Sequence, residues 1–188
     1  MEEIIKQLTT ETVEEKTLIF AGRWSERSRF YAFVDSEPHI VNIAGREVTT
    51  YLIKAQCKNC SSIEFGARIV ARVTSSPLNT VVEVTKIIGV EEEEYDPSSP
   101  APQVVRLLLT AFTADEEMRY VLAVAVDLTK YQRTKNVEES KFRILISGAA
   151  LTQLSNFVDA KAVIVRGIVT TGNGAVMRRA EVLSVVNK

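Results

Sequence analysis

The segment FGARIVARVTS, at residues 65–75, has a counterpart in VDAKAVIVRGIVTT, at residues 158–171. Each is rich in β-branched residues and is followed by turn residues and a further apolar segment. A second matched pair is RFYAFVD, at residues 29–35, and RYVLAVAVD, at residues 119–127. The two halves therefore predict an internal duplication of one small unit built from β-strands.

Short apolar runs separated by turn residues predict five strands in each copy. The predicted strands cover residues 17–24, 28–34, 48–55, 67–74 and 80–90, then 104–113, 118–128, 141–147, 161–171 and 175–186. Between the third and fourth strands of the second copy, Leu151, Leu154 and Phe157 recur at every third residue, which predicts a short helix that plugs one end of a barrel. The expected fold class is all-β with short helices, in two tandem five-stranded barrels.

Residues 91–102, EEEEYDPSSPAP, concentrate like charge, serine and proline without any apolar period. This composition is typical of an extended linker. We therefore expect a first domain at 1–90, with a short N-terminal helical segment, a linker at 91–102 and a second domain at 103–188. One hypothesis is that the acidic linker competes with phosphate for a basic face.

The charge is divided unevenly along a chain whose formal net charge is −1. Residues 1–96 hold 11 basic and 16 acidic residues, and residues 97–188 hold 12 basic and 8 acidic ones. No run approaches the about 18 apolar residues of a membrane span, and the first residues are acidic rather than basic. We expect an intracellular protein without a membrane partner, in the cytoplasm and associated with the nucleoid.

The sequence from residue 141 to residue 186, KFRILISGAALTQLSNFVDAKAVIVRGIVTTGNGAVMRRAEVLSVV, reads as strand, short helix, strand, tight turn and strand. This part resembles the OB fold of single-stranded DNA-binding proteins, in particular the replication protein A group and its archaeal relatives. The resemblance implies single-stranded DNA binding in replication, repair or recombination. Single-stranded RNA binding and a scaffold role, with a protein partner subunit or a homo-oligomer, remain as alternatives.

In the first copy, cations surround the chain's single tryptophan in the sequence AGRWSERSRF. Binding to a single strand needs both a basic groove and exposed aromatic faces. If Phe30, Ala32 and Val34 fill the interior, alternate residues face outward. The candidate nucleic-acid-binding residues are Arg23, Trp24, Arg27, Arg29, Tyr31 and Phe33, with Arg68, Arg72 and the turn at 75–79 as the other wall. The alternative is that Trp24 and Phe33 pack against the N-terminal segment or the other copy.

In the second copy, the same alternation predicts a core of Met118, Tyr120, Leu122, Phe142 and Ile144. It predicts an open face with Arg119 and Arg143. The loop at 127–136 and the last two strands add a basic rim, with Tyr131, Arg133, Arg166, Arg178 and Arg179 as further candidates. The alternative is an ordinary solvated face, or a surface that binds backbone or protein, because few aromatic residues are expected there.

Cys57 and Cys60 form a C-x-x-C pair, which is half of a zinc site. With a single histidine in the chain, His39, the other ligands are missing. We therefore expect no metal, no cofactor and two buried, inert thiols; zinc shared across a dimer and a disulfide are the alternatives. The sequence has no phosphate-binding loop and no nucleophile motif, so we expect a binding protein rather than an enzyme.

Overall fold

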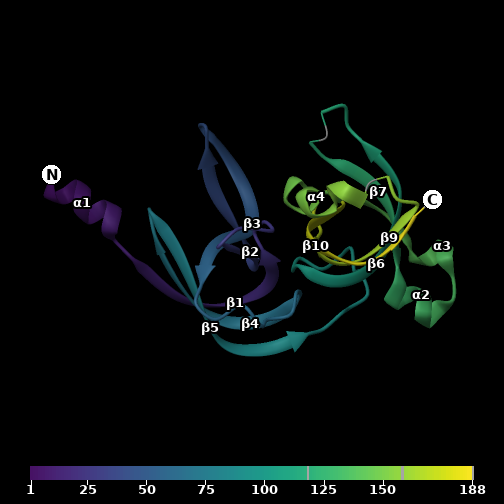
Figure 1. Cartoon of the computed structure of the whole chain (residues 1–188), viewed down its shortest axis with the longest axis horizontal. Helices are drawn as coiled ribbons and strands as arrows, with labels where there is room; N and C mark the ends of the chain where they lie inside the picture. Colours follow the sequence, from purple (N-terminus) through teal and green to yellow (C-terminus); the bar gives the residue numbers. More distant parts are fainter. Residues whose placement is uncertain (118, 158, 188) are drawn as a thin grey trace. The chain divides into compact units, whose positions relative to one another are not determined.

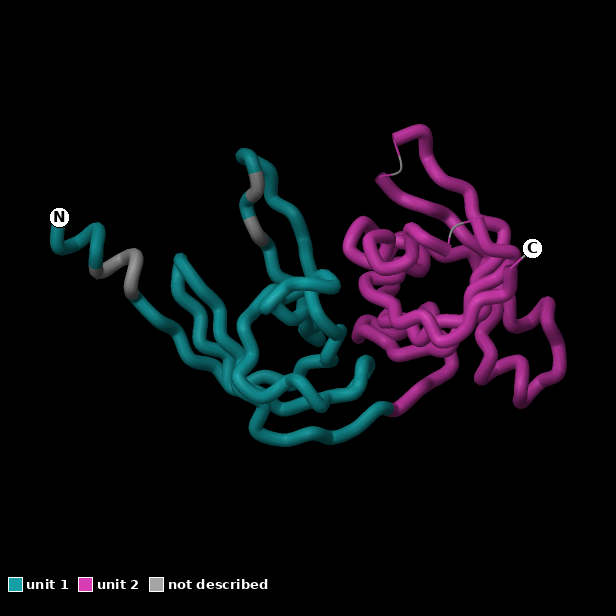
Figure 2. Tube along the Cα trace, viewed as in Figure 1, with its two compact units in different colours: residues 1–90 teal, residues 91–188 magenta. Residues whose placement is uncertain are grey.

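The computed structural model describes residues 1–117, 119–157 and 159–187, apart from the side chains of residues 6–9, 41 and 43. The chain divides into two compact units, Met1–Val90 and Glu91–Lys188 (Figure 2). Both units are built mainly from strands, as the sequence predicts (Figure 1). None of the helices within the described ranges is long and apolar enough to cross a membrane.

The first unit is a closed barrel whose strands follow the order β1-β2-β3-β5-β4. Every pairing is antiparallel except the junction of β3 with β5, which is parallel. This is the five-stranded barrel of the OB fold. Its elements are α1 (Glu2–Thr9), β1 (Thr12–Arg23), β2 (Tyr31–Ile43), β3 (Arg46–Cys57), β4 (Ala67–Ser76) and β5 (Asn79–Val90).

The second unit repeats this topology with the order β10-β8-β7-β6-β9, and the parallel junction joins β8 to β10. The fold class predicted from the sequence is therefore confirmed. Its elements are β6 (Gln103–Ala114), β7 (Val121–Asp127), α2 (Leu128–Thr134), α3 (Val137–Ser140), β8 (Lys141–Ile146), α4 (Gly148–Leu154), the 3₁₀ helix η1 (Ser155–Phe157), β9 (Ala162–Thr170) and β10 (Ala175–Val186).

The predicted plugging helix is present in the second unit as α4 followed by η1. Leu151 and Leu154 are buried in the barrel core, where Phe157 packs beside them. The segment after β7, predicted as a loop, is helical instead. Asp127 caps α2 by accepting a hydrogen bond from the Lys130 amide, and Asn136 caps α3 in the same way through the Glu139 amide.

The direction of several strand side chains differs from the predicted alternation. Phe33 is fully buried and packs on Phe20 in the first core, so it faces inward rather than outward. Tyr120 and Leu122 were expected in the second core, but they are 40% and 44% exposed. Phe142 and Ile144 do contact that core, as predicted, while Met118 lies outside the described residues.

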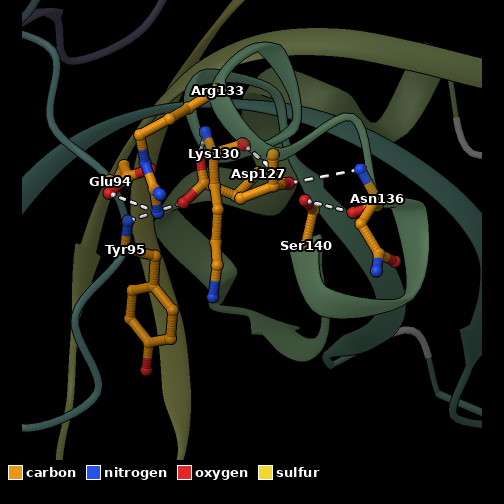
Figure 3. A network of polar contacts seen from close by, with 8 residues as sticks. Glu94, Tyr95, Asp127, Lys130, Arg133, Asn136 and Ser140 are labelled. Carbon is orange, nitrogen blue, oxygen red and sulfur yellow. Dashed lines mark hydrogen bonds and ion pairs between the residues drawn. The ribbon is translucent and has the colours of Figure 1, made fainter.

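The acidic segment is part of the second unit rather than a free linker. Its backbone is bonded to that barrel: the Glu93 amide donates to the Val104 carbonyl at 2.9 Å, and the Tyr95 amide donates to the Asp127 carboxylate at 2.7 Å (Figure 3). The Tyr95 ring also stacks on Phe142, with the ring centroids 4.3 Å apart. These contacts hold the segment along the second barrel.

Candidate nucleic-acid interface

A groove of about 540 Å³ lies on the first barrel, between the β1–β2 loop and the β4–β5 turn. Its floor comes from β3, and residues 76–80 form the wall on the side of the β4–β5 turn. In OB folds, oligonucleotides bind to the face of the second and third strands, between these same two loops. We call this feature the first-barrel groove; its lining is Arg29, Phe30, Lys54, Gln56 and residues 76–80.

Cations and aromatic rings are packed together at this groove. The Lys54 ammonium lies 5.2 Å from the centre of the Trp24 ring and 5.0 Å from that of Phe30. The Arg29 guanidinium lies 5.2 Å from the Phe30 ring. Among the described residues, neither Arg29 nor Lys54 forms an ion pair with a carboxylate. Both charges are therefore available to an anionic ligand.

The loop that carries these groups is held in shape by its own contacts. The Trp24 amide donates to the Phe30 carbonyl at 2.9 Å, which closes the β1–β2 loop. Arg23 donates to the Ser28 carbonyl at 3.0 Å and lies over the Tyr31 ring. A bulge in β1 precedes the loop, and Gly22 adopts a φ of +76° there, a backbone conformation that a side chain would disfavour.

The structure gathers only some of the predicted first-barrel residues at the groove. Arg29 lines it, and Trp24 contacts Lys54 beside it. Tyr31 packs against the core instead, with its ring centroid 5.7 Å from that of Phe20. Arg68 and Arg72 lie on β4, whose neighbours are β1 and β5, and they do not line the groove. Arg27 is exposed in the loop.

Four groove residues were not predicted: Phe30, Lys54, Gln56 and Thr80. Phe30 was assigned to the interior, but it lies on the outer side with Lys54. Lys54 lies between Ile53, which packs on the core, and Ala55, which is buried in it. The alternation of Ile53 and Ala55 with the polar Lys54 and Gln56, at the end of β3, was therefore the signal in the sequence that marks the outer face there.

A larger groove, of about 1110 Å³, shares Lys54 and Thr80 with the first-barrel groove. At its base Asp35 is 3% exposed and binds Lys16 at 2.7 Å and His39 at 2.6 Å. Burial alone would raise the pKa of Asp35, but hydrogen bonds from Lys16, the Glu37 amide and His39 outweigh it and hold the pKa below its ordinary value. This cluster fixes β2 at the irregularity where its register with β3 shifts.

The second barrel presents a different surface at the corresponding place. On the outer side of β7 and β8, Leu122 pairs with Leu145 and Val124 pairs with Arg143. Arg143 is exposed and forms no ion pair within the described part of the chain. Together with the exposed Tyr120, this face is mostly apolar.

The remaining arginines of the second barrel are bound to acidic or polar groups. Arg166 is 9% exposed and donates to Glu92 through Nε at 3.0 Å and Nη2 at 2.8 Å. Arg133 donates to Glu94 at 2.8 Å (Figure 3), and Arg119 pairs with Asp115 at 3.0 Å. Arg178 donates to the Thr170 hydroxyl, Arg179 is 1% exposed and donates to the Ala149 carbonyl, and Tyr131 is half-buried on α2.

Glu92 lies between two arginines that face each other across neighbouring strands. Arg106 on β6 is the register partner of Arg166 on β9, and both donate to the same carboxylate oxygen of Glu92. Burial alone would raise the pKa of Glu92, but the hydrogen bonds from Arg166 and Arg106 hold it below its ordinary value. Like charges directly opposite each other destabilise a sheet, so Glu92 stabilises this pairing.

The two cysteines are joined by a disulfide between Cys57 and Cys60, so the expectation of two free thiols is wrong. Both sulfur atoms are used in this bond. No cluster of metal-binding side chains occurs among the residues whose positions are described.

No family model matches this sequence. No curated protein matches it. Among solved structures, the chain is similar to the crystal structure of the tetrameric p202 HIN2, with 9% sequence identity and a TM-score of 0.42 over 94% of this chain and 98% of that chain. A similarity at this level says nothing about what the chain binds.

Proposed function

We propose that the chain binds single-stranded nucleic acid through the first-barrel groove, without catalysis, and that DNA is the preferred strand. The observation that supports this most directly is the pair of cations, Arg29 and Lys54, which lack carboxylate partners in the described chain and lie against the rings of Phe30 and Trp24. A role in replication, repair or recombination is the finer part of the proposal.

The mechanism is phosphate neutralisation combined with base stacking. Arg29 and Lys54 attract the backbone, while Phe30 and Trp24 offer ring faces to unpaired bases. Each stacked base contributes about 1 to 3 kcal/mol, with little dependence on its identity. Two neutralised phosphates predict a slope of about −1.4 for the logarithm of the association constant against the logarithm of salt concentration. The binding is thus moderate, salt-sensitive and weakly sequence-specific.

The absence of turnover is part of the proposal. General acid–base chemistry most often uses histidine, and the chain has one. The Nε2 atom of His39 is hydrogen-bonded to Asp35, which is also bound by Lys16. This arrangement supports a structural role for His39 where the register of β2 with β3 shifts.

The test is a titration of fluorescein-labelled oligo-dT, followed by anisotropy at low salt. We expect Arg29→Glu with Lys54→Glu to weaken binding by at least about tenfold, since two attractions become repulsions. The matched control is Arg72→Glu, an exposed arginine on β4 outside the groove, which should change affinity by less than about twofold. Equal losses in both variants would contradict the assignment of the groove.

The same titration with oligo-rU separates DNA from RNA. A tighter complex with oligo-dT supports DNA as the preferred ligand. A tighter complex with oligo-rU contradicts it and supports RNA instead. Trp24→Ala should also weaken binding of the preferred strand while the circular dichroism spectrum of the folded chain is retained.

A second candidate function is supported by the second barrel, whose outer β7–β8 face exposes Tyr120 and Leu122. Apolar side chains at such a site are typical of a protein-binding surface rather than of a phosphate-binding one. A scaffold subunit or a homo-oligomer would use this face. Light scattering over a range of concentrations tests self-association, and Leu122→Glu should lower the measured mass if this face forms the contact.

A further inference from the structure

The Cys57–Cys60 disulfide lies where the first barrel closes. The parallel junction of β3 with β5 pairs Gln56 with Val81 and Cys57 with Val82. The disulfide therefore begins at the last paired residue of β3. Cys60, at its other end, is 2% exposed and belongs to the barrel core.

The turn inside the disulfide continues this junction by hydrogen bonds. The Lys58 amide donates to the Val82 carbonyl at 3.3 Å. The Asn59 side chain bonds Val84 in both directions: its Nδ2 donates to the Val84 carbonyl at 2.9 Å, and its Oδ1 accepts from the Val84 amide at 3.0 Å. The turn at residues 57–60 thus adds hydrogen bonds to β5 beyond those of the β3–β5 ladder.

The second barrel also holds its fifth strand by a side-chain hydrogen bond, but without a cysteine. Its β8–β10 junction spans three register pairs, from Ala175–Ile144 to Met177–Ile146. The side chain of Gln153, on α4, accepts a hydrogen bond from the Ala180 amide of β10 at 2.8 Å. In both barrels, an amide side chain between the third and fourth strands bonds an amide of the fifth strand. A helix positions that side chain in the second barrel, and a disulfide-bonded turn positions it in the first.

The junction is continuous with the first-barrel groove. Gln56 both lines the groove and pairs with Val81, and Lys54 precedes it on the same strand. Thr80, on the wall formed by residues 76–80, precedes Val81 on β5. Any loosening of β3 from β5 therefore moves the floor of the groove relative to the wall formed by residues 76–80.

We infer that the Cys57–Cys60 disulfide is a redox-sensitive modification site: its reduction by a dithiol releases the Asn59 contact with β5 and weakens ligand binding in the first-barrel groove. The last part of this inference rests on the proposed function.

The chemistry is thiol–disulfide exchange. One thiolate of the dithiol attacks Cys57 Sγ, since Cys57 is only half-buried, and the Cys60 thiolate leaves and takes up a proton. The second thiolate of the reagent then attacks its own mixed-disulfide sulfur and releases Cys57. The protein gains two electrons and two protons, and the dithiol is oxidised to a cyclic disulfide.

The first test is hydrogen exchange by NMR, which does not depend on any ligand. The Val84 amide is the reporter, since it donates to Asn59, and the Ala180 amide is the matched control. With dithiothreitol, we expect exchange at Val84 to quicken by at least about tenfold while Ala180 stays unchanged. Equal protection of Val84 in the oxidised and reduced protein would overturn the inference.

Two variants separate the disulfide from the side chain that it positions. Cys57→Ser with Cys60→Ser should show rapid Val84 exchange with or without dithiothreitol. In Asn59→Ala, the disulfide remains but the hydrogen-bond acceptor of the Val84 amide is missing. Val84 should therefore exchange rapidly in both redox states. A redox response that persists in Asn59→Ala would also overturn the inference.

The second test is the oligo-dT titration of oxidised and reduced protein. We expect reduction to weaken binding by about fivefold, because a loosened groove has to be ordered again on binding. An unchanged affinity, together with faster Val84 exchange, would refute the coupling between the disulfide and the groove. If the oxidised protein does not bind any oligonucleotide, the proposed function fails, and the Val84 exchange still decides whether the disulfide controls the junction.

Discussion

The two barrels share one topology but differ in the groups that their basic side chains contact. In the first, Arg29 and Lys54 lie beside aromatic rings at a groove and lack carboxylate partners in the described chain. In the second, Arg166 and Arg133 are bound by glutamates of the acidic segment. The more basic half of the sequence is thus the half in which several arginines are paired with carboxylates: Arg106, Arg119, Arg133 and Arg166. Total charge is therefore a poor guide to the binding site, and the pairing of each charge is a better one.

The barrels also differ in how they are closed between the third and fourth strands. The second uses α4, which places Leu154 in the core at 3% exposure. We expect Leu154→Ala to destabilise the chain by about 3 kcal/mol, because it leaves a cavity under the helix. Urea unfolding measures the loss, and Leu183→Ala, at a position 38% exposed on β10, is the control that should change little. Similar effects of the two substitutions would show that α4 does not close the barrel.

The next largest loss of stability is expected when Glu92 is replaced. Replacing it with Gln leaves Arg106 and Arg166 opposed across β6 and β9, and we expect a loss of about 2 kcal/mol at neutral pH. The same variant tests whether the acidic segment competes with phosphate: if it does, oligo-dT should bind more tightly at low salt. A variant that is as stable as the wild type would contradict the role of Glu92 between these arginines.

In the first barrel, Asp35 provides the corresponding acid-sensitive contact. Its pKa in the folded chain lies below the ordinary 3.8, so its contribution is complete above that value and is lost as the pH falls through the folded pKa. Asp35→Asn should cost about 1 to 2 kcal/mol at pH 7, and this cost should shrink as the pH falls below 3.8 through the folded pKa. Urea midpoints measured from pH 7 down to pH 2 check this, and a difference that stays constant with pH would count against it.

The smallest effect is expected at Glu94. Its partner Arg133 lies on an exposed surface, with its side chain 63% exposed, and exposed ion pairs contribute little. Glu94→Gln should leave the urea midpoint unchanged within error. A loss as large as that of Glu92→Gln would mean that the acidic segment as a whole, rather than Glu92 alone, stabilises the second barrel.

The strands were predictable because each is a short apolar run that ends at turn residues. The direction in which their side chains point was harder to predict from the sequence. Residues 30–34, FYAFV, are all apolar, so alternation alone cannot tell inside from outside; the pairing of Phe20 with Phe33 decides it. The same holds for residues 120–126. Where polar and apolar residues do alternate, as around Lys54, the outer face could be identified from the sequence.

Contacts between distant residues account for the rest. Glu92 meets Arg166, 74 residues away, so a run of glutamates that is typical of a solvated linker becomes a partner of the barrel only after folding. A C-x-x-C pair is likewise compatible with thiols, a metal site or a disulfide until the turn between Cys57 and Cys60 is seen. The helix α2 could have been predicted from the sequence, because Asp127 occupies its N-cap position.

Trp24 is the chain's single indole, and it lies in the first unit beside Lys54. When tryptophan is excited selectively over tyrosine, the fluorescence therefore comes from the first unit alone, and the second unit does not contribute to it. An unlabelled sample thus carries its own probe of events in the first barrel, and a spectroscopist can watch that barrel melt or take up a ligand without interference from its twin.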